Sequence, residues 1–130
     1  MYLCGPINGC TDAECSDWRT LAKAHFGETI DPMRRDYRGS ELDKMREIVE
    51  LDKIDVQKCD IVLANCPKPS VGTSMEIFFA CQEGKIVVSI VPVRSKASPW
   101  LVYHSDKVVE SMEEACDFIH KLCNLVGRAS

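Results

Sequence analysis

The sequence predicts an α/β fold, specifically a single doubly wound domain of the flavodoxin or Rossmann type. Short apolar runs alternate with helical patterns along the chain, which is typical of a parallel sheet covered by helices on both faces. The length of 130 residues, of which 45% are hydrophobic, suits one domain with a substantial core. We therefore expect residues 1–130 to form a three-layer αβα domain around a five-stranded parallel sheet.

The expected strands are short apolar segments that end at turn-forming residues. They are residues 2–4, 29–30, 61–64, 86–91 and 107–109, of which the last is the weakest. The spacing of apolar residues predicts helices over residues 11–26, 40–58, 73–83 and 112–126, the second of them capped by Ser40. Residues 33–39, rich in arginine and tyrosine, have no clear period and are predicted to be a loop.

Composition excludes several classes of protein. With 16 basic and 20 acidic residues the formal net charge is −4, whereas dedicated nucleic-acid-binding proteins usually carry a basic patch. No run approaches the roughly 20 apolar residues of a membrane span. Strand-like sequence begins at Tyr2, which leaves no room for a secretory signal peptide. We expect a cytoplasmic protein that binds neither a membrane nor a nucleic-acid polymer.

Eight cysteines are the one unusual feature of the composition, and we interpret them as reduced, mostly structural thiols. No Cys-x-x-Cys pair occurs. Cys116, His120 and Cys123 fall on one face of the last predicted helix, where they could hold a zinc ion. Because apolar residues share that face, packing is the favoured interpretation, and we expect no metal.

In a doubly wound sheet, ligands bind beyond the carboxyl ends of the strands, near the switch in strand order. The loops over residues 5–11, 31–39, 65–72 and 92–99 should therefore share one rim. The first of these loops contains two glycines, which let the backbone approach a ligand closely; it reads Gly5, Pro6, Ile7, Asn8 and Gly9. It matches neither the dinucleotide fingerprint nor a Walker loop, so taken alone it is better interpreted as an ordinary strand-to-helix turn.

Glu76 has two interpretations. With Thr73 it would form a capping box, in which the glutamate side chain bonds back to the backbone at the start of the helix. Alternatively it is an anionic group on the binding rim, because residues 77–81 make the helix apolar nearly all round and therefore central. A position in the first turn favours an ionised carboxylate, which can attack or stabilise an electron-poor carbon.

Asp52 interrupts an apolar stripe formed by Leu42, Met45, Val49 and Val56. A carboxylate on a core-facing stripe is costly unless it has a partner or faces a cavity. Burial there would raise its pKa, as suits a proton donor, whereas a salt bridge to a neighbouring lysine or arginine is the alternative. Two carboxylates in different environments indicate a nucleophile and an acid, the pair that cleaves a glycosidic bond with retention. The side chains available to pack on a flat heteroaromatic ring are Trp18, Met33, Tyr37 and Trp100.

Together these motifs resemble the nucleoside 2-deoxyribosyltransferase superfamily, which also contains the 2'-deoxynucleoside 5'-monophosphate N-hydrolases. The resemblance is carried by residues 2–7, 60–64 and 72–77 and by Asp52, and covers roughly residues 2–98. By position, Glu76 matches the family's nucleophile, which attacks C1' of deoxyribose and forms a covalent intermediate. Asp52 matches the acid that assists the departure of the base, and Tyr2 matches a tyrosine that positions the nucleophile.

The resemblance also implies the partners and the binding residues. It implies no metal or organic cofactor, and a homodimer or larger homo-oligomer in which a neighbouring subunit completes each pocket. The implied ligands are a deoxynucleoside or deoxynucleotide and a nucleobase. The substrate-binding residues expected on this basis are Gly5, Pro6, Ile7, Asn8, Gly9, Met33, Ser70, Gly72 and Ser98.

The 5' group of the substrate is left open by the resemblance. Many transferases of free nucleosides have an acidic residue six positions before the nucleophile, where this chain has Ser70, as the monophosphate hydrolases do. Ser98 falls near a second phosphate-contacting serine of those hydrolases. Against this, Asn8 stands where some hydrolases carry an arginine, and a neutral amide holds phosphate less strongly than a guanidinium does.

We therefore predict that Glu76 displaces the base of a 2'-deoxynucleoside or its 5'-monophosphate and that the sugar passes to another base. Hydrolysis, with water as the acceptor, is the alternative within the same family. A nucleotide-binding sensor without catalysis is the alternative from another class, since a fold does not fix a function. A flavodoxin-like electron carrier is disfavoured, because no Ser/Thr-rich loop follows the first strand.

Overall fold

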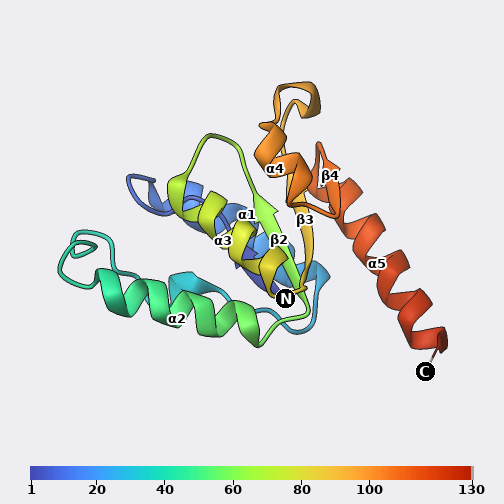
Figure 1. Ribbon diagram of the computed structural model, residues 1–130, viewed down its shortest axis with the longest axis horizontal. Helices are drawn as coiled ribbons and strands as arrows, with labels where there is room; N and C mark the ends of the chain where they lie inside the picture. The colour runs from blue at the N-terminus through green and yellow to red at the C-terminus, as the bar shows by residue number, and fades with distance from the viewer. Residues whose placement is uncertain (130) are drawn as a thin grey trace.

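The computed structural model describes residues 1–129, a parallel sheet with helices packed against it (Figure 1). The strands run in the order β1-β2-β3-β4 and are β1 (Tyr2–Cys4), β2 (Ile61–Asn65), β3 (Ile86–Ile90) and β4 (Lys107–Val109). The α-helices of this part of the chain are α1 (Asp12–His25), α2 (Met45–Gln57), α3 (Val71–Gln82), α4 (Pro99–Tyr103) and α5 (Met112–Ala129). Short 3-10 helices occupy Pro32–Arg34 and Arg94–Lys96.

Within residues 1–129 the sheet has four strands, so the prediction of five is wrong. Residues 29–30 contribute a single parallel bridge, between Ile30 and Tyr2. The extended segment stops there because Asp31 and Pro32 begin a 3-10 helix, and proline has no N–H to donate to a ladder. When Ile30 is counted as a position at the edge of β1, the spatial order is the 2-1-3-4-5 of flavodoxin-like folds. The strand order therefore switches at β1.

Alternate side chains of each strand fill two separate cores. Tyr2 and Cys4 of β1 point toward α2 and α3, in a core that also contains Val56, Val62, Ala64, Ile77, Ala80 and Val87. Leu3 points the other way, toward α1 and α5, in a core that also contains Ala22, Leu63, Val88, Ile90, Val109, Ala115 and Ile119. This alternation puts helices on both faces, an arrangement consistent with three αβα layers, and α2 and α5 lie on opposite sides of the strands in Figure 1.

Two helices begin at other residues than predicted. Ser40 does not cap α2: its hydroxyl donates to the carbonyl oxygen of Tyr37 at 3.2 Å within a turn, and the helix starts at Met45. The helix α3 starts at Val71, two residues before the predicted start, because the Ser70 hydroxyl accepts from the backbone N–H of Thr73 and caps the helix. Residues 99–103, which carry no helix prediction, form α4. No helix in residues 1–129 has the length and apolar character needed to cross a membrane.

At position 5, directly after β1, the surroundings leave room only for a glycine. A Cβ on Gly5 would lie 2.6 Å from Trp18 Cζ2 and 3.3 Å from the carbonyl oxygen of Asn65. We expect Gly5→Ala to lower the free energy of unfolding by about 1–3 kcal/mol, since the indole or the loop must move. Urea denaturation measures this change. Gly27→Ala is the matched control, because a Cβ on Gly27 meets nothing within 4 Å. Equal losses in the two variants would contradict the close packing of Gly5 on Trp18.

Candidate active site

A cavity of about 160 Å³ lies beyond the carboxyl ends of β1 and β2, next to the switch in strand order. Four segments that are distant in sequence line it: the loop after β1, residues 32–41, the helix α2 and the start of α3. The lining residues are Gly5, Ile7, Asn8, Pro32, Arg35, Tyr37, Arg38, Glu41, Ile48, Asp52, Ser70, Gly72, Thr73 and Glu76. The fold thus brings the two candidate carboxylates, Glu76 and Asp52, to one cavity.

Glu76 lies in the second turn of α3, not in the first, and makes no capping box, so that interpretation is wrong. Its Oε2 atom is buried without a hydrogen-bond partner, and its Oε1 atom lies 3.9 Å from where a Cβ on Gly72 would be. Burial raises the pKa of Glu76 to about 8, and the charge of Asp52 acts in the same direction. A buried carboxyl with an unpaired oxygen costs stability, and such groups concentrate at functional sites.

Tyr2 and Cys4 lie behind Glu76 on β1, and both are fully buried. The Tyr2 hydroxyl has no hydrogen-bond partner, while the Cys4 thiol donates to the carbonyl oxygen of Thr73 at 3.7 Å. Burial raises the pKa of Tyr2 far above its usual range, and the nearby charge of Glu76 adds to this effect. Burial likewise raises the pKa of the Cys4 thiol. Both groups therefore stay protonated beside Glu76, as hydrogen-bond donors and not as nucleophiles.

Asp52 faces the cavity and also has an ionic partner, so both interpretations of this residue apply. Its Oδ1 atom lies 3.5 Å from Nη2 of Arg35. Burial raises the pKa of Asp52, and the charge of Arg35 opposes this effect. The stripe that singled it out faces the core only at Val56, which is buried, whereas Leu42, Met45 and Val49 are exposed.

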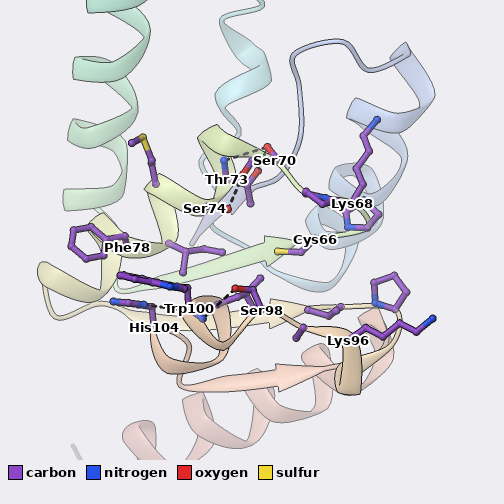
Figure 2. Close-up of a pocket in the computed structure, with 18 of the residues that line it drawn as sticks. Cys66, Lys68, Ser70, Thr73, Ser74, Phe78, Lys96, Ser98, Trp100 and His104 are labelled. Carbon is purple, nitrogen blue, oxygen red and sulfur yellow. Dashed lines mark hydrogen bonds between the residues drawn. The ribbon is translucent and has the colours of Figure 1, made fainter.

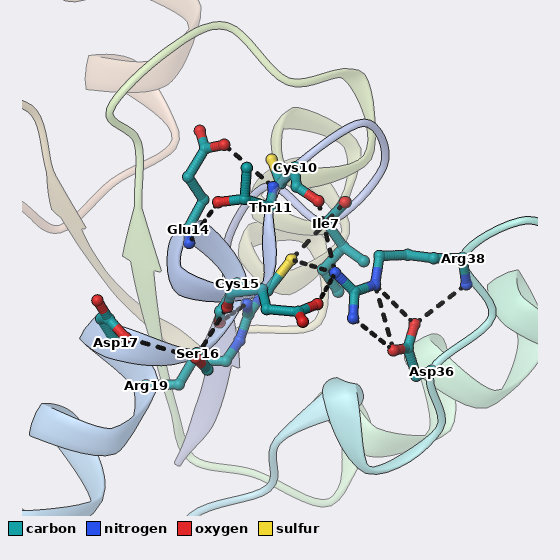
Figure 3. Close-up of polar contacts among 11 residues, drawn as sticks. Ile7, Cys10, Thr11, Glu14, Cys15, Ser16, Asp17, Arg19, Asp36 and Arg38 are labelled. Carbon is teal, nitrogen blue, oxygen red and sulfur yellow. Dashed lines mark hydrogen bonds and ion pairs between the residues drawn. The ribbon is translucent and has the colours of Figure 1, made fainter.

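The loop after β1 is fixed by polar contacts to α1 and to residues 36–38 (Figure 3). Thr11 caps α1 and forms a capping box with Glu14. The Arg38 guanidinium reaches this loop: Nη1 lies 3.4 Å from the carbonyl oxygen of Cys10 and 2.8 Å from Oδ1 of Asp12. Its Nη2 atom pairs with Asp36 at 2.7 Å. A cation therefore lies near Asn8, but two aspartates already neutralise it.

Arg19 is a buried residue of the site region that sequence reasoning missed. Only 1% of it is exposed, and its guanidinium donates to the carbonyl oxygens of Cys15 at 2.6 Å and Gly5 at 3.1 Å. Its Nε atom lies 3.4 Å from Oδ1 of Asp31, and the group stacks on Trp18. Arg19 thus ties the loop after β1 to α1 and to the segment after Ile30. The sequence does contain one indication that Arg19 is buried: Cys15, Arg19 and Ala22 are spaced at i, i+4 and i+7 and so share one face of α1.

Comparison with known proteins identifies the family of the chain. The sequence model of the nucleoside 2-deoxyribosyltransferase family matches residues 1–119. The chain belongs to this family. The matched region contains every residue that lines the cavity. The family consists of enzymes that act on small-molecule nucleosides and nucleobases, which indicates a function of the nucleoside deoxyribosyltransferase type. Among curated proteins, none matches the chain.

Not all residues that the family resemblance suggested lie at the Glu76 cavity. Ser98 caps α4 and lines a second, larger cavity of about 770 Å³, together with Phe78, Trp100 and His104 (Figure 2). The two cavities share Ser70 and Thr73, whose hydroxyls are 2.9 Å apart. Of the other suggested residues, Gly5, Ile7, Asn8, Ser70 and Gly72 line the smaller cavity, whereas Pro6, Gly9 and Met33 line neither.

The described part of this family member contains no cluster of three His, Cys, Asp or Glu side chains that could hold a metal ion. In the last helix, Cys116 is buried, Cys123 is exposed, and the His120 Nε2 atom lies 3.3 Å from the carbonyl oxygen of His25. All eight cysteines are free thiols, and those that are buried are Cys4, Cys15, Cys59 and Cys116.

Proposed function

We propose that the protein cleaves the N-glycosidic bond of 2'-deoxynucleosides through a covalent deoxyribosyl intermediate on Glu76 and transfers the sugar to another nucleobase. The observation that carries this proposal is the state of Glu76. Its Oε2 atom is buried without a hydrogen-bond partner, burial raises its pKa to about 8, and the carboxyl group shares a small cavity with a second carboxyl whose pKa is also raised. Retaining cleavage of a glycosidic bond uses two carboxyl groups, one as nucleophile and the other as acid, and Glu76 and Asp52 are the pair at this cavity.

Glu76 reacts in its ionised form, which a pKa of about 8 makes the minor species at neutral pH. In the first step a bond forms between C1' of the deoxyribose and this carboxylate, while the bond from C1' to the base nitrogen breaks. The electron pair of the broken bond leaves with the base, and Asp52 supplies a proton or a hydrogen bond to it. The protonated Tyr2 hydroxyl, next to Glu76, positions the nucleophile. In the second step an acceptor base attacks C1', the ester bond to Glu76 breaks, and the acceptor's proton returns to Asp52.

The charges of the cavity favour a free nucleoside over its 5'-monophosphate. Two guanidinium groups line the cavity, and both are already paired: Arg35 with Asp55 and Asp52, and Arg38 with Asp12 and Asp36. A phosphate group would have to share one of them with a carboxylate, whereas a 5' hydroxyl needs no cation. Asn8 and Ser70 provide neutral hydrogen-bonding groups for such a hydroxyl.

We further propose that the protein functions as a homo-oligomer. A cavity of about 160 Å³ is below the roughly 300–1,000 Å³ of typical ligand pockets, so a second subunit is needed to enclose a nucleoside. The exposed apolar side chains of Leu42 before α2, Met45 and Val49 on α2, and Met75 on α3 supply surface for such a contact.

The proposal is tested by incubating the protein with deoxynucleosides and with their 5'-monophosphates, each with and without an acceptor base, and separating the products by chromatography. We expect a new deoxynucleoside only when the acceptor is present, and little reaction of the monophosphates. Free base and free sugar formed without an acceptor would instead establish hydrolysis. Binding without any product from either substrate class would contradict an enzymatic role and support a nucleotide sensor.

A further inference from the structure

Two arginines of the segment 33–39, Arg34 and Arg35, form ion pairs with the helix that carries Asp52. We propose that Arg35, held in place by Asp55, is a positioning residue that fixes the Asp52 carboxyl in the cavity and controls whether it carries a proton. This inference rests on the function proposed for Asp52, but it makes a prediction about ionisation that holds apart from any reaction.

Asp55 and Asp52 both contact the Arg35 guanidinium, but Asp55 is much closer to it. Asp52 and Asp55 are three residues apart on α2 and therefore lie on the same helix face. The Nη2 atom of Arg35 is 2.5 Å from Oδ2 of Asp55 but 3.5 Å from Oδ1 of Asp52. The other carboxylate oxygen of Asp55 is taken by Nη2 of Arg34, at 2.8 Å. Asp55 is fully paired, whereas Asp52 has only a long contact and keeps lone pairs free for a ligand.

Burial explains why Asp55, and not Asp52, determines where Arg35 lies. The Asp55 side chain is 4% exposed, compared with 23% for Asp52 and 21% for Arg35. A short charge-assisted hydrogen bond that water cannot reach is much stronger than a long, partly solvated contact. The planar guanidinium is also stiff, so fixing one nitrogen fixes the direction in which the others point.

Several other ionisable groups surround Asp52, and the signs of their charges determine the direction in which each one shifts its pKa. Those that face it or its cavity are Arg34, Arg35, Tyr37, Arg38 and Glu41 from the loop, Asp55 on its own helix, Tyr2 and Cys4 from β1, and Glu76 from α3. Burial and the charge of Asp55 raise the pKa of Asp52, while Arg35 and Arg34 lower it. Arg35 and Asp55 thus act on the proton of Asp52 in opposite directions.

The two residues should therefore give opposite changes when they are removed. In Arg35→Gln, Asp52 loses its cation and holds its proton to higher pH. In Asp55→Asn, Arg35 is released toward Asp52 and a negative neighbour disappears, so Asp52 loses its proton at lower pH. The opposite shifts follow from the opposite charges that Arg35 and Asp55 place near Asp52.

The test is a 13C NMR titration of the side-chain carboxyl groups in the full chain, with Asp52→Asn used to assign the Asp52 signal. We expect its pKa to rise by about one unit in Arg35→Gln and to fall by about one unit in Asp55→Asn. Arg46→Gln is the matched control, because it removes an exposed positive charge from the same helix and should leave the titration unchanged. Arg35→Lys keeps the positive charge but lacks the planar guanidinium group, so the pKa of Asp52 in this variant should lie between its values in Arg35→Gln and in the unmodified protein. Circular dichroism verifies that each variant is folded.

Kinetics separate this inference from the proposed function. If base exchange occurs, the pH profile of kcat/KM should shift to higher pH in Arg35→Gln and to lower pH in Asp55→Asn. The reason is that the apparent pKa values of this profile belong to the coupled pair of Glu76 and Asp52. Titration shifts in the same direction for both variants, or none in either, would overturn the inference even in an active enzyme. Opposite titration shifts in a protein that shows no base exchange would support the inference and contradict the proposed function.

Discussion

Replacing Glu76 with glutamine should remove base exchange, with kcat/KM falling at least about 1,000-fold, and should at the same time stabilise the protein at alkaline pH. The amide has nearly the shape of the carboxyl group but cannot attack C1'. Burial raises the pKa of Glu76 from 4.5 to about 8, so the folded protein disfavours the charged form. The free energy of unfolding therefore falls as pH rises from about 4.5 to about 8 and recovers none of this loss above that range.

Glutamine cannot ionise and avoids this loss. The melting temperature of Glu76→Gln should thus match that of the unmodified protein at about pH 5 and exceed it at about pH 9. Calorimetry measures both melting temperatures directly. Glu50→Gln, which removes an exposed carboxylate from α2, is the control and should show no such pH dependence. Full activity in Glu76→Gln would contradict the proposed nucleophile, and equal melting temperatures at alkaline pH would contradict its buried state.

Arg19→Met should cause the largest loss of stability of any arginine replacement considered, about 3–5 kcal/mol in the free energy of unfolding. Methionine fills much of the same space but donates no hydrogen bonds. The carbonyl oxygens of Gly5 and Cys15 would lose their donor, and Asp31 would keep only Lys23, at 2.6 Å, as its ionic partner. Buried acceptors without a donor are costly, and one of these two, the carbonyl oxygen of Gly5, belongs to the loop that lines the cavity.

Urea denaturation of Arg19→Met, compared with Arg46→Met, measures this effect. Arg46 is exposed on α2, so its replacement should change the free energy of unfolding by no more than about 0.5 kcal/mol. Losses of similar size in the two variants would show that the buried contacts of Arg19 do not hold the loop after β1.

The periodicity of apolar residues predicts most elements of this fold because it reflects burial on sheet and helix faces. The last strand, residues 107–109, has the predicted bounds, although its pattern is weak. The failures have local causes. Residues 29–30 look like a strand, but the next two residues, Asp31 and Pro32, start a helix instead of continuing the ladder. At the start of α3, Ser70 and Thr73 are both capping residue types, and only packing decides between them.

The candidate site could be predicted only in part. Glu76 and Asp52 could be predicted because a carboxylate within an apolar pattern is costly to bury unless it has a partner or a function. The fold does bring both to one cavity. The contacts that tune them come from other segments: Arg35 from the loop that follows Ile30, and Arg19 from α1. No periodicity links those segments to α2 or α3. Ser98 could not be placed either, because the path of the chain before α4 decides which cavity it faces.

The shortness of both sheet edges limits how copies of this chain can associate. At one edge Ile30 is, within residues 1–129, the only residue that pairs with β1, and at the other edge β4 has three residues, one of them the exposed Lys107. Short edges that carry charge are poor templates for adding a strand from another molecule, which protects a parallel sheet from edge-to-edge aggregation. The homo-oligomer proposed above should therefore form through the helix faces, where Met45 and Val49 of α2 are exposed.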